Sequence, residues 1–286
     1  MEIAKAALRD RSVRCRAATA IGVAALLLAV LGQPALACGR TTDCGLGERS
    51  YRIVLPESHA PGEPLGAIIF AHGYRGSAAG TMRSDALAGL AQTLNIAVVA
   101  ADADGPDWQI PGVPSFPGAD GAAELAYFDA LRDDLLQRFA IDPARIVATG
   151  FSAGGMMTWH LACHRGDAYA GFVPLAGTFW APLPESCPTA TVDLIHYHGT
   201  ADSIVPIEGR SIADTRQGDV REAMALFTTA GSYSPADGEP APGLDCALRR
   251  NAGGQRLELC LFDGGHELRI EHLMRALRLL GLSSAD

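Results

Sequence analysis

Short apolar or β-branched runs alternate with amphipathic stretches along most of this chain. Seven runs predict strands, at residues 51–56, 66–73, 96–102, 145–150, 171–177, 193–199 and 256–264. Most of them are apolar on both faces, as strands inside a parallel sheet are. The clearest helical pattern runs from residue 121 to residue 139. This alternation predicts an α/β domain with a mostly parallel sheet and helices on both faces.

Two segments rich in proline and glycine interrupt the alternation. Residues 107–121 and 234–243 predict long surface loops, and we expect the second to be mobile. The sequence has no internal repeat and no linker that would divide it. It therefore predicts one folded domain after the N-terminal segment.

The first 37 residues differ from the rest. Five basic residues precede an apolar run that ends in Ala35 and Ala37, just before Cys38. This is the layout of a cleaved secretory signal. A membrane anchor is the alternative, but the run is about 15 residues long and a spanning helix needs about 20. Lipid attachment at Cys38 is a third interpretation, which the residues before it match poorly.

The net negative charge of the chain argues against some classes of binding partner. The formal net charge is −9, and residues 1–37 hold five basic and two acidic side chains, so the rest of the chain carries −12. Such a surface repels nucleic acid and anionic membranes. Lys5 is the only lysine, so its removal with the signal excludes Schiff-base chemistry, a serine–lysine dyad and a P-loop lysine.

The cysteines indicate an oxidising compartment. Cys15 leaves with the signal, and an even number remains, which suggests disulfides. Six cysteines allow fifteen connectivities, of which sequential pairing closes the shortest loops without crossing. The favoured pairs are Cys38–Cys44, Cys163–Cys187 and Cys246–Cys260.

A serine between two glycines is the first candidate for chemistry. In "TGFSAGGMM", residues 149–157, Ser152 follows a predicted strand and opens a helical stretch. Gly150 and Gly154 would let the backbone pass through a sharp corner that exposes the hydroxyl. Chance is the alternative in a glycine-rich chain, but the strand before and the helix after favour a nucleophile.

A serine nucleophile needs a base that an acid orients. Asp202 follows the strand predicted at 193–199, and His266 follows the one at 256–264, in the chain order Ser, Asp, His. Asp193 and Asp263 are rival acids. His272 is the only other histidine after Asp202, and it falls in a helical pattern.

The loops after other predicted strands supply further candidates. The backbone N–H groups of Ala153 and Tyr74 are the expected oxyanion-hole donors. Trp108, Phe179 and Trp180 follow strand ends, and they line a substrate pocket or pack in the core equally well.

The sequence gives little reason to expect a metal or cofactor. His196 and His198 project to one face of a predicted strand, but no third ligand lies near them. Trp159, in the helix after Ser152, is expected in the core.

Taken together, these motifs resemble the secreted α/β-hydrolase esterases grouped with polyhydroxybutyrate depolymerases and feruloyl esterases. The resemblance runs from Cys38 to the C-terminus and rests on "CGRTTDCGLGERSYRIVLP", "FAHGYRGS", "FDALRDDLLQRFAIDPARIVATGFSAGGMM", "HGTADSIVP" and "DGGH". It implies an α/β-hydrolase catalytic domain over residues 38–286, a triad of Ser152, Asp202 and His266, and disulfides among the mature cysteines. Many members place tryptophan and proline after the catalytic histidine, whereas "HELRIEHL" stands here.

We therefore expect a secreted serine carboxylesterase that acts on feruloyl or other aryl esters, or on hydroxyalkanoate esters, without a cofactor. One alternative is a peptidase of the prolyl-oligopeptidase type, which shares the triad order. Another is a non-catalytic binding protein on the same fold.

Overall fold

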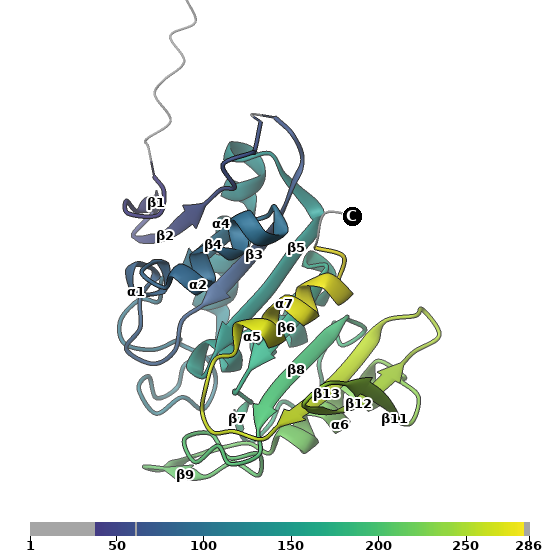
Figure 1. The fold of residues 1–286 in the computed structure, drawn as a ribbon. Helices are drawn as coiled ribbons and strands as arrows, with labels where there is room; N and C mark the ends of the chain where they lie inside the picture. Colours follow the sequence, from purple (N-terminus) through teal and green to yellow (C-terminus); the bar gives the residue numbers. More distant parts are fainter. Residues whose placement is uncertain (1–37, 61, 283–286) are drawn as a thin grey trace, which may run out of the picture. The chain divides into compact units, whose positions relative to one another are not determined.

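The computed structural model describes residues 38–60 and 62–282 (Figure 1). The segment interpreted as a signal, residues 1–37, lies outside them. The main sheet has ten strands: β1 (Cys44–Leu46), β2 (Arg49–Val54), β3 (Leu65–Ala71), β4 (Ala97–Ala101), β5 (Ile141–Phe151), β6 (Gly171–Leu175), β8 (Leu194–Gly199), β11 (Asp237–Ala241), β12 (Leu244–Arg250) and β13 (Arg256–Phe262).

The centre of this sheet is parallel and its two edges are antiparallel. The strand order is β1-β2-β4-β3-β5-β6-β8-β13-β12-β11. The strands from β4 to β13 in this order run parallel, whereas β1, β2, β12 and β11 pair antiparallel with their neighbours. Because the parallel strands end at one edge, the loops that follow them gather there.

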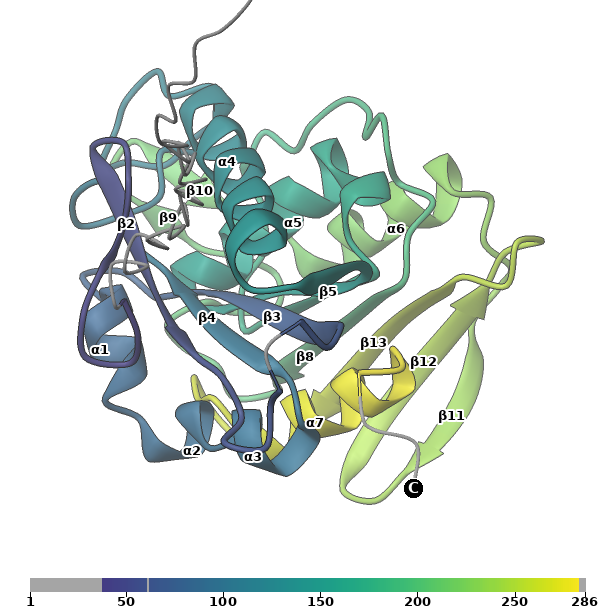
Figure 2. The ribbon, with the colours of Figure 1, turned by 90° about the horizontal axis from the view of Figure 1, so that it is seen from above.

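Two helical layers cover the sheet (Figure 2). One contains α4 (Ala122–Arg138), α5 (Ala153–His164) and α6 (Val220–Ala230). The other contains α1 (Ala78–Met82), α2 (Asp85–Ala88), α3 (Leu90–Leu94) and α7 (Ile270–Leu279). Alternate residues of β3 enter different cores, with Ile69 on the α5 side and Ile68 on the α7 side. Burial of both strand faces explains the continuous apolar runs.

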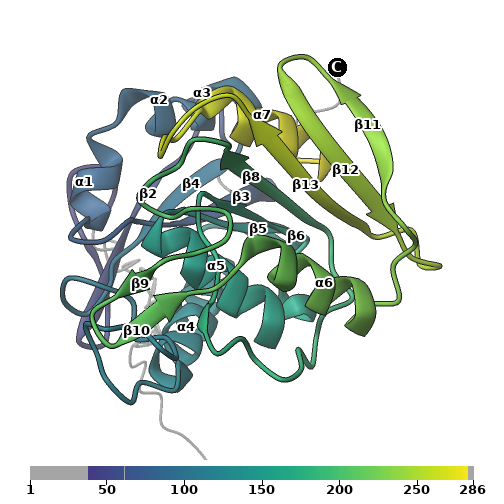
Figure 3. The same cartoon turned by 90° about the horizontal axis from the view of Figure 1, so that it is seen from below.

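A small second sheet lies on the α5 side, beyond the strand ends (Figure 3). It has the order β7 (Trp180–Ala181), β10 (Thr215–Gln217), β9 (Ser211–Ile212), all antiparallel. A short 3-10 turn, η1 (Gly166–Ala168), follows α5. Asp219 caps α6, because its carboxylate accepts a hydrogen bond from the Arg221 N–H at 2.6 Å.

Most of the predicted elements are confirmed. All seven predicted strands are present within a few residues of their expected ends, and α4 occupies the predicted helical range. Residues 107–121 contain no helix or strand, as expected. The prediction of a mobile loop at 234–243 is wrong, because β11 pairs there with β12. Pro240 is tolerated since β11 is an edge strand, where an N–H is not needed.

Three disulfides join neighbouring parts of this fold. They link Cys38 to Cys44, Cys163 to Cys187 and Cys246 to Cys260, which is the sequential pairing. The last one connects directly opposed residues of β12 and β13. The antiparallel extension at this edge of the sheet is therefore covalently linked.

Candidate active site

Ser152 occupies a strained corner between β5 and α5. Its φ is 60° and its ψ is −121°, a backbone conformation that residues other than glycine rarely adopt. The Ser152 N–H donates to the Leu175 carbonyl at 2.9 Å, and its own carbonyl accepts from Met156 N–H at 3.0 Å. These contacts with β6 and α5 hold the corner, which has the geometry of a nucleophile elbow.

The two glycines around Ser152 are required by close backbone contacts. A Cβ on Gly154 would lie 1.9 Å from the carbonyl oxygen of Ala71, and one on Gly150 would lie 2.3 Å from the carbonyl oxygen of Gly154. No side chain fits at either position. The glycine spacing of the motif therefore follows from the packing of the corner against β3.

Asp202 and His266 meet at the same edge of the sheet. Asp202 follows β8, His266 follows β13, and these strands are parallel neighbours. The His266 Nδ1 lies 2.7 Å from Asp202 Oδ2. Asp202 Oδ1 accepts from the backbone N–H groups of Ile204, at 2.9 Å, and Val205, at 2.8 Å. A carboxylate acceptor requires Nδ1–H on the imidazole, which leaves Nε2 as a free base.

The environment of Asp202 keeps it ionised although its side chain is fully buried. Burial raises the pKa of Asp202, but hydrogen bonds from His266 and Val205 lower it more, so it lies below the usual 3.8. The rival acids lie elsewhere. Asp193, at the start of β8, accepts from the Arg256 N–H at 2.7 Å, and Asp263 is exposed.

Ser152 is connected to His266 through its neighbour in the chain. The Phe151 ring lies 4.7 Å from the His266 imidazole, measured between ring centroids. In the part of the chain that the structure describes, no hydrogen bond joins Ser152 Oγ to His266. Such contacts are often open without substrate and shorten when it binds.

The two predicted oxyanion donors, Ala153 and Tyr74, belong to different segments that border the serine cavity. Ala153 is the first residue of α5, so its N–H has no partner within the helix. Tyr74 follows β3, and the Cβ of Ser152 lies 3.5 Å from where a Cβ on Gly73 would stand. His72 holds this loop, since its Nδ1 contacts the Gly73 carbonyl at 2.9 Å and its Nε2 accepts from Ala103 N–H at 3.1 Å.

A cavity of about 300 Å³ opens over Ser152. It is lined by Tyr74, Asp107, Pro114, Ser115, Ser152, Ala153, Met156, Trp180, Ile204, Val205, Arg210, Ile212 and Gln217. Both predicted oxyanion donors are among them. The cavity therefore joins the elbow, the loop after β3 and the small sheet in one concave site.

Comparison with known proteins agrees with this geometry. The Phospholipase/Carboxylesterase family matches residues 123–227, which include Ser152 and Asp202. The putative esterase NocK of Nocardia uniformis subsp. tsuyamanensis is 31% identical over 172 residues, which cover 58% of this chain and 48% of NocK. Feruloyl esterase C of Emericella nidulans is 27% identical over 230 residues, which cover 77% and 76% of the two chains. An acetyl xylan esterase from Aspergillus awamori has the same fold, with a TM-score of 0.62 and 14% identity over 82% of this chain and 95% of that one.

The chain has the α/β-hydrolase fold and is similar in sequence to esterases. The predicted fold class and the predicted resemblance are thus confirmed. The chain spans about half the length of NocK and most of the length of feruloyl esterase C.

The three aromatic residues that follow strand ends lie in different places. Trp180 lines the serine cavity, but Phe179 lies in a smaller cavity beside it. Of the two alternatives left open for Trp108, the structure shows core packing and not a place in the serine cavity. Trp108 is fully buried, its Nε1 donates to the His72 carbonyl at 2.8 Å, and its ring packs 5.6 Å from Phe128. Trp159 is in the core, as expected.

The histidine pair on β8 supports the acid loop. The His196 Nε2 lies 2.9 Å from His198 Nδ1, and His198 Nε2 contacts the Val205 carbonyl at 2.6 Å. Both rings are fully buried. Burial lowers the pKa of each, so both are neutral at pH 7. The pair thus braces the turn that presents the Val205 N–H to Asp202.

Two further observations concern other classes of site. Within residues 38–60 and 62–282, the one cluster with metal-ligand atoms close together is Cys246, Glu258 and Cys260, and its cysteines form a disulfide. None of the helices that the structure describes is long and apolar enough to cross a membrane.

Proposed function

We propose that this α/β-hydrolase is a secreted serine carboxylesterase with Ser152, His266 and Asp202 as its catalytic triad. The observation that carries the proposal is the 2.7 Å contact between His266 Nδ1 and Asp202 Oδ2, at the sheet edge where Ser152 stands in its strained elbow. A fully buried carboxylate, an imidazole with a free Nε2 and a partly exposed corner serine are the parts of a nucleophilic acyl-transfer site.

The first half-reaction forms an acyl-enzyme. His266 Nε2 removes the proton from Ser152 Oγ as the oxygen attacks the ester carbonyl carbon. The carbonyl oxygen becomes an oxyanion, which accepts hydrogen bonds from the N–H groups of Ala153 and Tyr74. The tetrahedral intermediate collapses, His266 returns the proton to the alcohol oxygen, and the alcohol leaves.

The second half-reaction restores the serine. Water gives a proton to His266 Nε2 and attacks the acyl carbon, and the carboxylic acid leaves as Ser152 regains its proton. Asp202 stays ionised throughout and stabilises the imidazolium. Every step uses a side chain or a backbone N–H of this chain, so no cofactor is needed.

The proposed substrates are feruloyl or other aryl esters, with hydroxyalkanoate esters as the second class. Relatives that carry the name feruloyl esterase support the first class. The cavity of about 300 Å³, with Met156, Ile204 and Trp180 in its walls, is large enough for a single aryl acyl group.

Secretion is part of the same proposal. Residues 1–37 would be removed as a signal peptide, and residues 38–286 would be the mature catalytic domain. The three disulfides support an oxidising compartment. Because the Cys38 sulfur is bonded to Cys44, the structure favours ordinary cleavage over lipid attachment at Cys38.

A fluorophosphonate probe tests the nucleophile directly. We expect the wild-type protein to be labelled at Ser152, with peptide mapping to residues 149–157, and Ser152→Ala to remain unlabelled. Ser58, an exposed serine outside this cavity, provides the control, and Ser58→Ala should label at the wild-type rate. Equal labelling of the wild type and Ser152→Ala would contradict the proposal, as would a folded wild type that does not label.

Substrate comparison separates the esterase from a peptidase. We expect the protein to hydrolyse p-nitrophenyl acetate and methyl ferulate but not peptide anilides. The hydroxybutyrate dimer ester is measured beside methyl ferulate, to compare the two proposed classes of ester. Hydrolysis of the anilides alone would replace the esterase assignment with a peptidase.

A further inference from the structure

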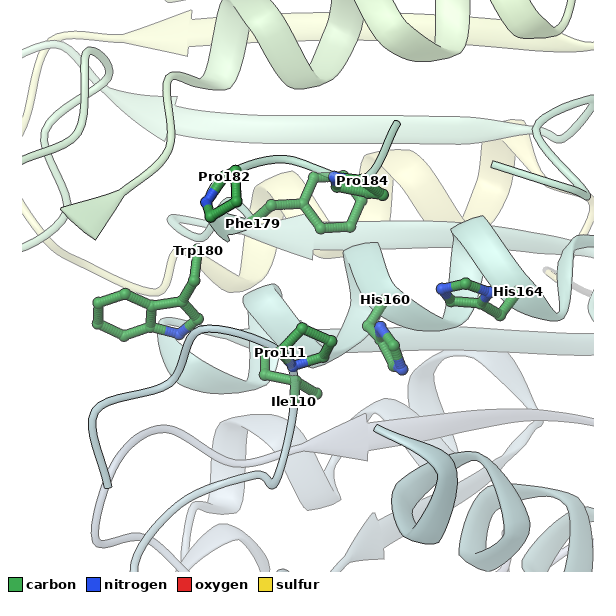
Figure 4. Close-up of a pocket in the computed structure, with 8 residues that line it drawn as sticks. All are labelled: Ile110, Pro111, His160, His164, Phe179, Trp180, Pro182 and Pro184. Carbon is green, nitrogen blue, oxygen red and sulfur yellow. The ribbon is translucent and has the colours of Figure 1, made fainter. Parts of the chain in front are cut away.

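A second cavity, of about 180 Å³, lies beside the serine cavity and shares Trp180 with it (Figure 4). Three segments form it: the loop at 107–121, the C-terminal half of α5, and residues 179–184. None of its other lining residues also lines the serine cavity. It is therefore a separate space that touches the proposed active site through one indole.

The walls of this cavity are rigid rings. Pro111, Pro182 and Pro184 contribute pyrrolidine rings, whose backbone φ is fixed. Phe179 packs 5.6 Å from the core residue Trp159, between ring centroids. Figure 4 shows these rings and the indole of Trp180 around one open centre. The cavity exists without a ligand, so binding would cost little reordering.

The position of Trp180 is fixed from the opposite side. A Cβ on Gly112 would lie 2.6 Å from the Cβ of Trp180, so the loop at 107–121 packs directly against it. Gly112 also has a φ of 80°, a backbone conformation that favours glycine over residues with a side chain. The shared wall of the two cavities is thus held by the same loop that supplies Pro111.

Two histidines supply the polar part of the lining, and both are uncharged at pH 7. His160 and His164 lie one turn apart on α5, with ring centroids 4.7 Å apart. Burial lowers the pKa of His160 to about 4, and burial together with Arg165 lowers that of His164. Arg165 itself is paired with Asp129 at 2.8 Å. No charged side chain is among the described residues that line the cavity.

We propose that this cavity is a binding site for a neutral six-membered aromatic ring, separate from the site of ester cleavage. A dry cavity of about 150 Å³ with apolar walls is known to hold benzene, so this volume is sufficient for one ring. Flat rings on several sides favour offset or edge-to-face contacts with an aromatic ligand. The imidazole of His164, half-buried at the rim, can hydrogen-bond a hydroxyl on the ring.

The site would be coupled to the serine cavity through Trp180. A ring held against Trp180 in this cavity restricts a side chain that also lines the serine cavity. The site itself does not depend on ester hydrolysis, so its test needs no turnover.

Titration with benzyl alcohol tests the site in the full chain. Calorimetry should give one binding event with a Kd on the order of 1 mM, as expected for a ligand of this size. Benzylammonium, the charged analogue, should bind at least about tenfold more weakly, because the lining offers its charge no partner. Equal affinity of the two probes would contradict the uncharged site.

Two filling variants locate the ring. His164→Trp fills the second cavity and should weaken benzyl alcohol binding at least about tenfold. Ile204→Trp fills the serine cavity instead, from a residue that is 49% exposed, and should leave the affinity within about twofold. The reverse pattern would assign the ring to the serine cavity and overturn the proposal.

A spectroscopic readout reports binding next to Trp180, the wall that both cavities share, and the two filling variants decide which cavity holds the ring. Trp108 and Trp159 are fully buried in the core, and Trp180 is the tryptophan that lines a cavity. Benzyl alcohol should therefore change the indole N–H resonance of Trp180 in wild-type protein, assigned with Trp180→Phe, and leave the other two unchanged. The proposal is wrong if no resonance shifts and no saturable heat appears up to about fifty times the expected Kd.

Discussion

Among the described residues, Asp202 and Glu258 both have fully buried carboxylates, but their partners differ. Asp202 accepts hydrogen bonds from one imidazole and two backbone N–H groups, at 2.7 to 2.9 Å. Glu258 is held by two guanidinium groups, with Arg256 Nη1 at 2.7 Å and Arg275 Nη2 at 2.8 Å. Asp202 stands in a loop after β8, whereas Glu258 lies inside β13 beside Ile195.

The partners decide what each carboxylate can do. An arginine is charged at every accessible pH, so the network around Glu258 fixes its geometry and passes no proton. A histidine changes charge near neutral pH, so the environment of Asp202 can stabilise an imidazolium that forms and disappears during turnover. One buried anion is thus suited to catalysis, and the other joins α7 to the sheet.

The largest expected effect is the loss of turnover when the Asp202 carboxylate is removed. Asp202→Asn keeps the size of the side chain but removes its charge and permits the wrong tautomer of His266. We expect kcat for p-nitrophenyl acetate to fall by about 10⁴, with KM nearly unchanged. A loss smaller than about tenfold in folded protein would show that Asp202 is not the acid of the triad.

A change at Glu258 should lower the stability of the protein and leave its turnover unchanged. Glu258→Gln leaves Arg256 and Arg275 beside a neutral amide, so we expect the free energy of unfolding to drop by about 3 kcal/mol. Activity per folded molecule should stay within about twofold. Urea unfolding with parallel kinetics measures both. The double variant Glu258→Gln, Arg275→Met should lose less than the sum of the single losses, since the pair is already broken.

The reacting residues were predictable because local sequence encodes the ends of strands. The glycines of the Ser152 motif are set by contacts with the Ala71 and Gly154 carbonyls, and these contacts leave a pattern in nine residues. Asp202 and His266 follow strands that periodicity identifies. The chain order Ser, Asp, His then predicted the pair of Asp202 and His266. In the structure, His266 Nδ1 lies 2.7 Å from Asp202 Oδ2.

The surroundings of the site depend on distant pairing, which periodicity does not reveal. Arg210 and Gln217 enter the serine cavity because β10 pairs with β7. The sequence left Trp108 open between pocket and core, because its contacts with the His72 carbonyl and Phe128 join residues distant in the chain. The buried partner of Arg275 depends likewise on where α7 packs against the sheet.

A third prediction concerns the backbone strain at the nucleophile, which has no equivalent around Glu258. Ser152→Gly relieves the positive φ, so we expect the free energy of unfolding to rise by about 1 kcal/mol while activity is abolished. Ser152→Ala is the matched control, because it removes the hydroxyl and keeps the strain. Equal stabilities of the two variants would show that the elbow stores no strain.

The smallest expected effect is the pH dependence of the Asp202 contribution to stability. The pKa of Asp202 is lower in the folded protein than its ordinary value, because hydrogen bonds from His266 and Val205 outweigh the effect of burial. The unfolded chain therefore binds a proton at higher pH than the folded protein does. The stabilisation is complete above the unfolded pKa of about 4 and is lost as the pH falls through the folded pKa.

The variant Asp202→Asn has no carboxylate at this position, so its free energy of unfolding lacks the pH-dependent contribution of Asp202. The difference in free energy of unfolding between wild type and Asp202→Asn should then shrink as the pH is lowered from about 6 to about 3. Ser152→Ala, with Asp202 intact, should follow the wild-type curve over the same range. A difference that stays constant or grows toward low pH would mean that the folded protein does not hold the Asp202 carboxylate ionised. Asp202 could then not stabilise an imidazolium, and its contrast with Glu258 would be wrong.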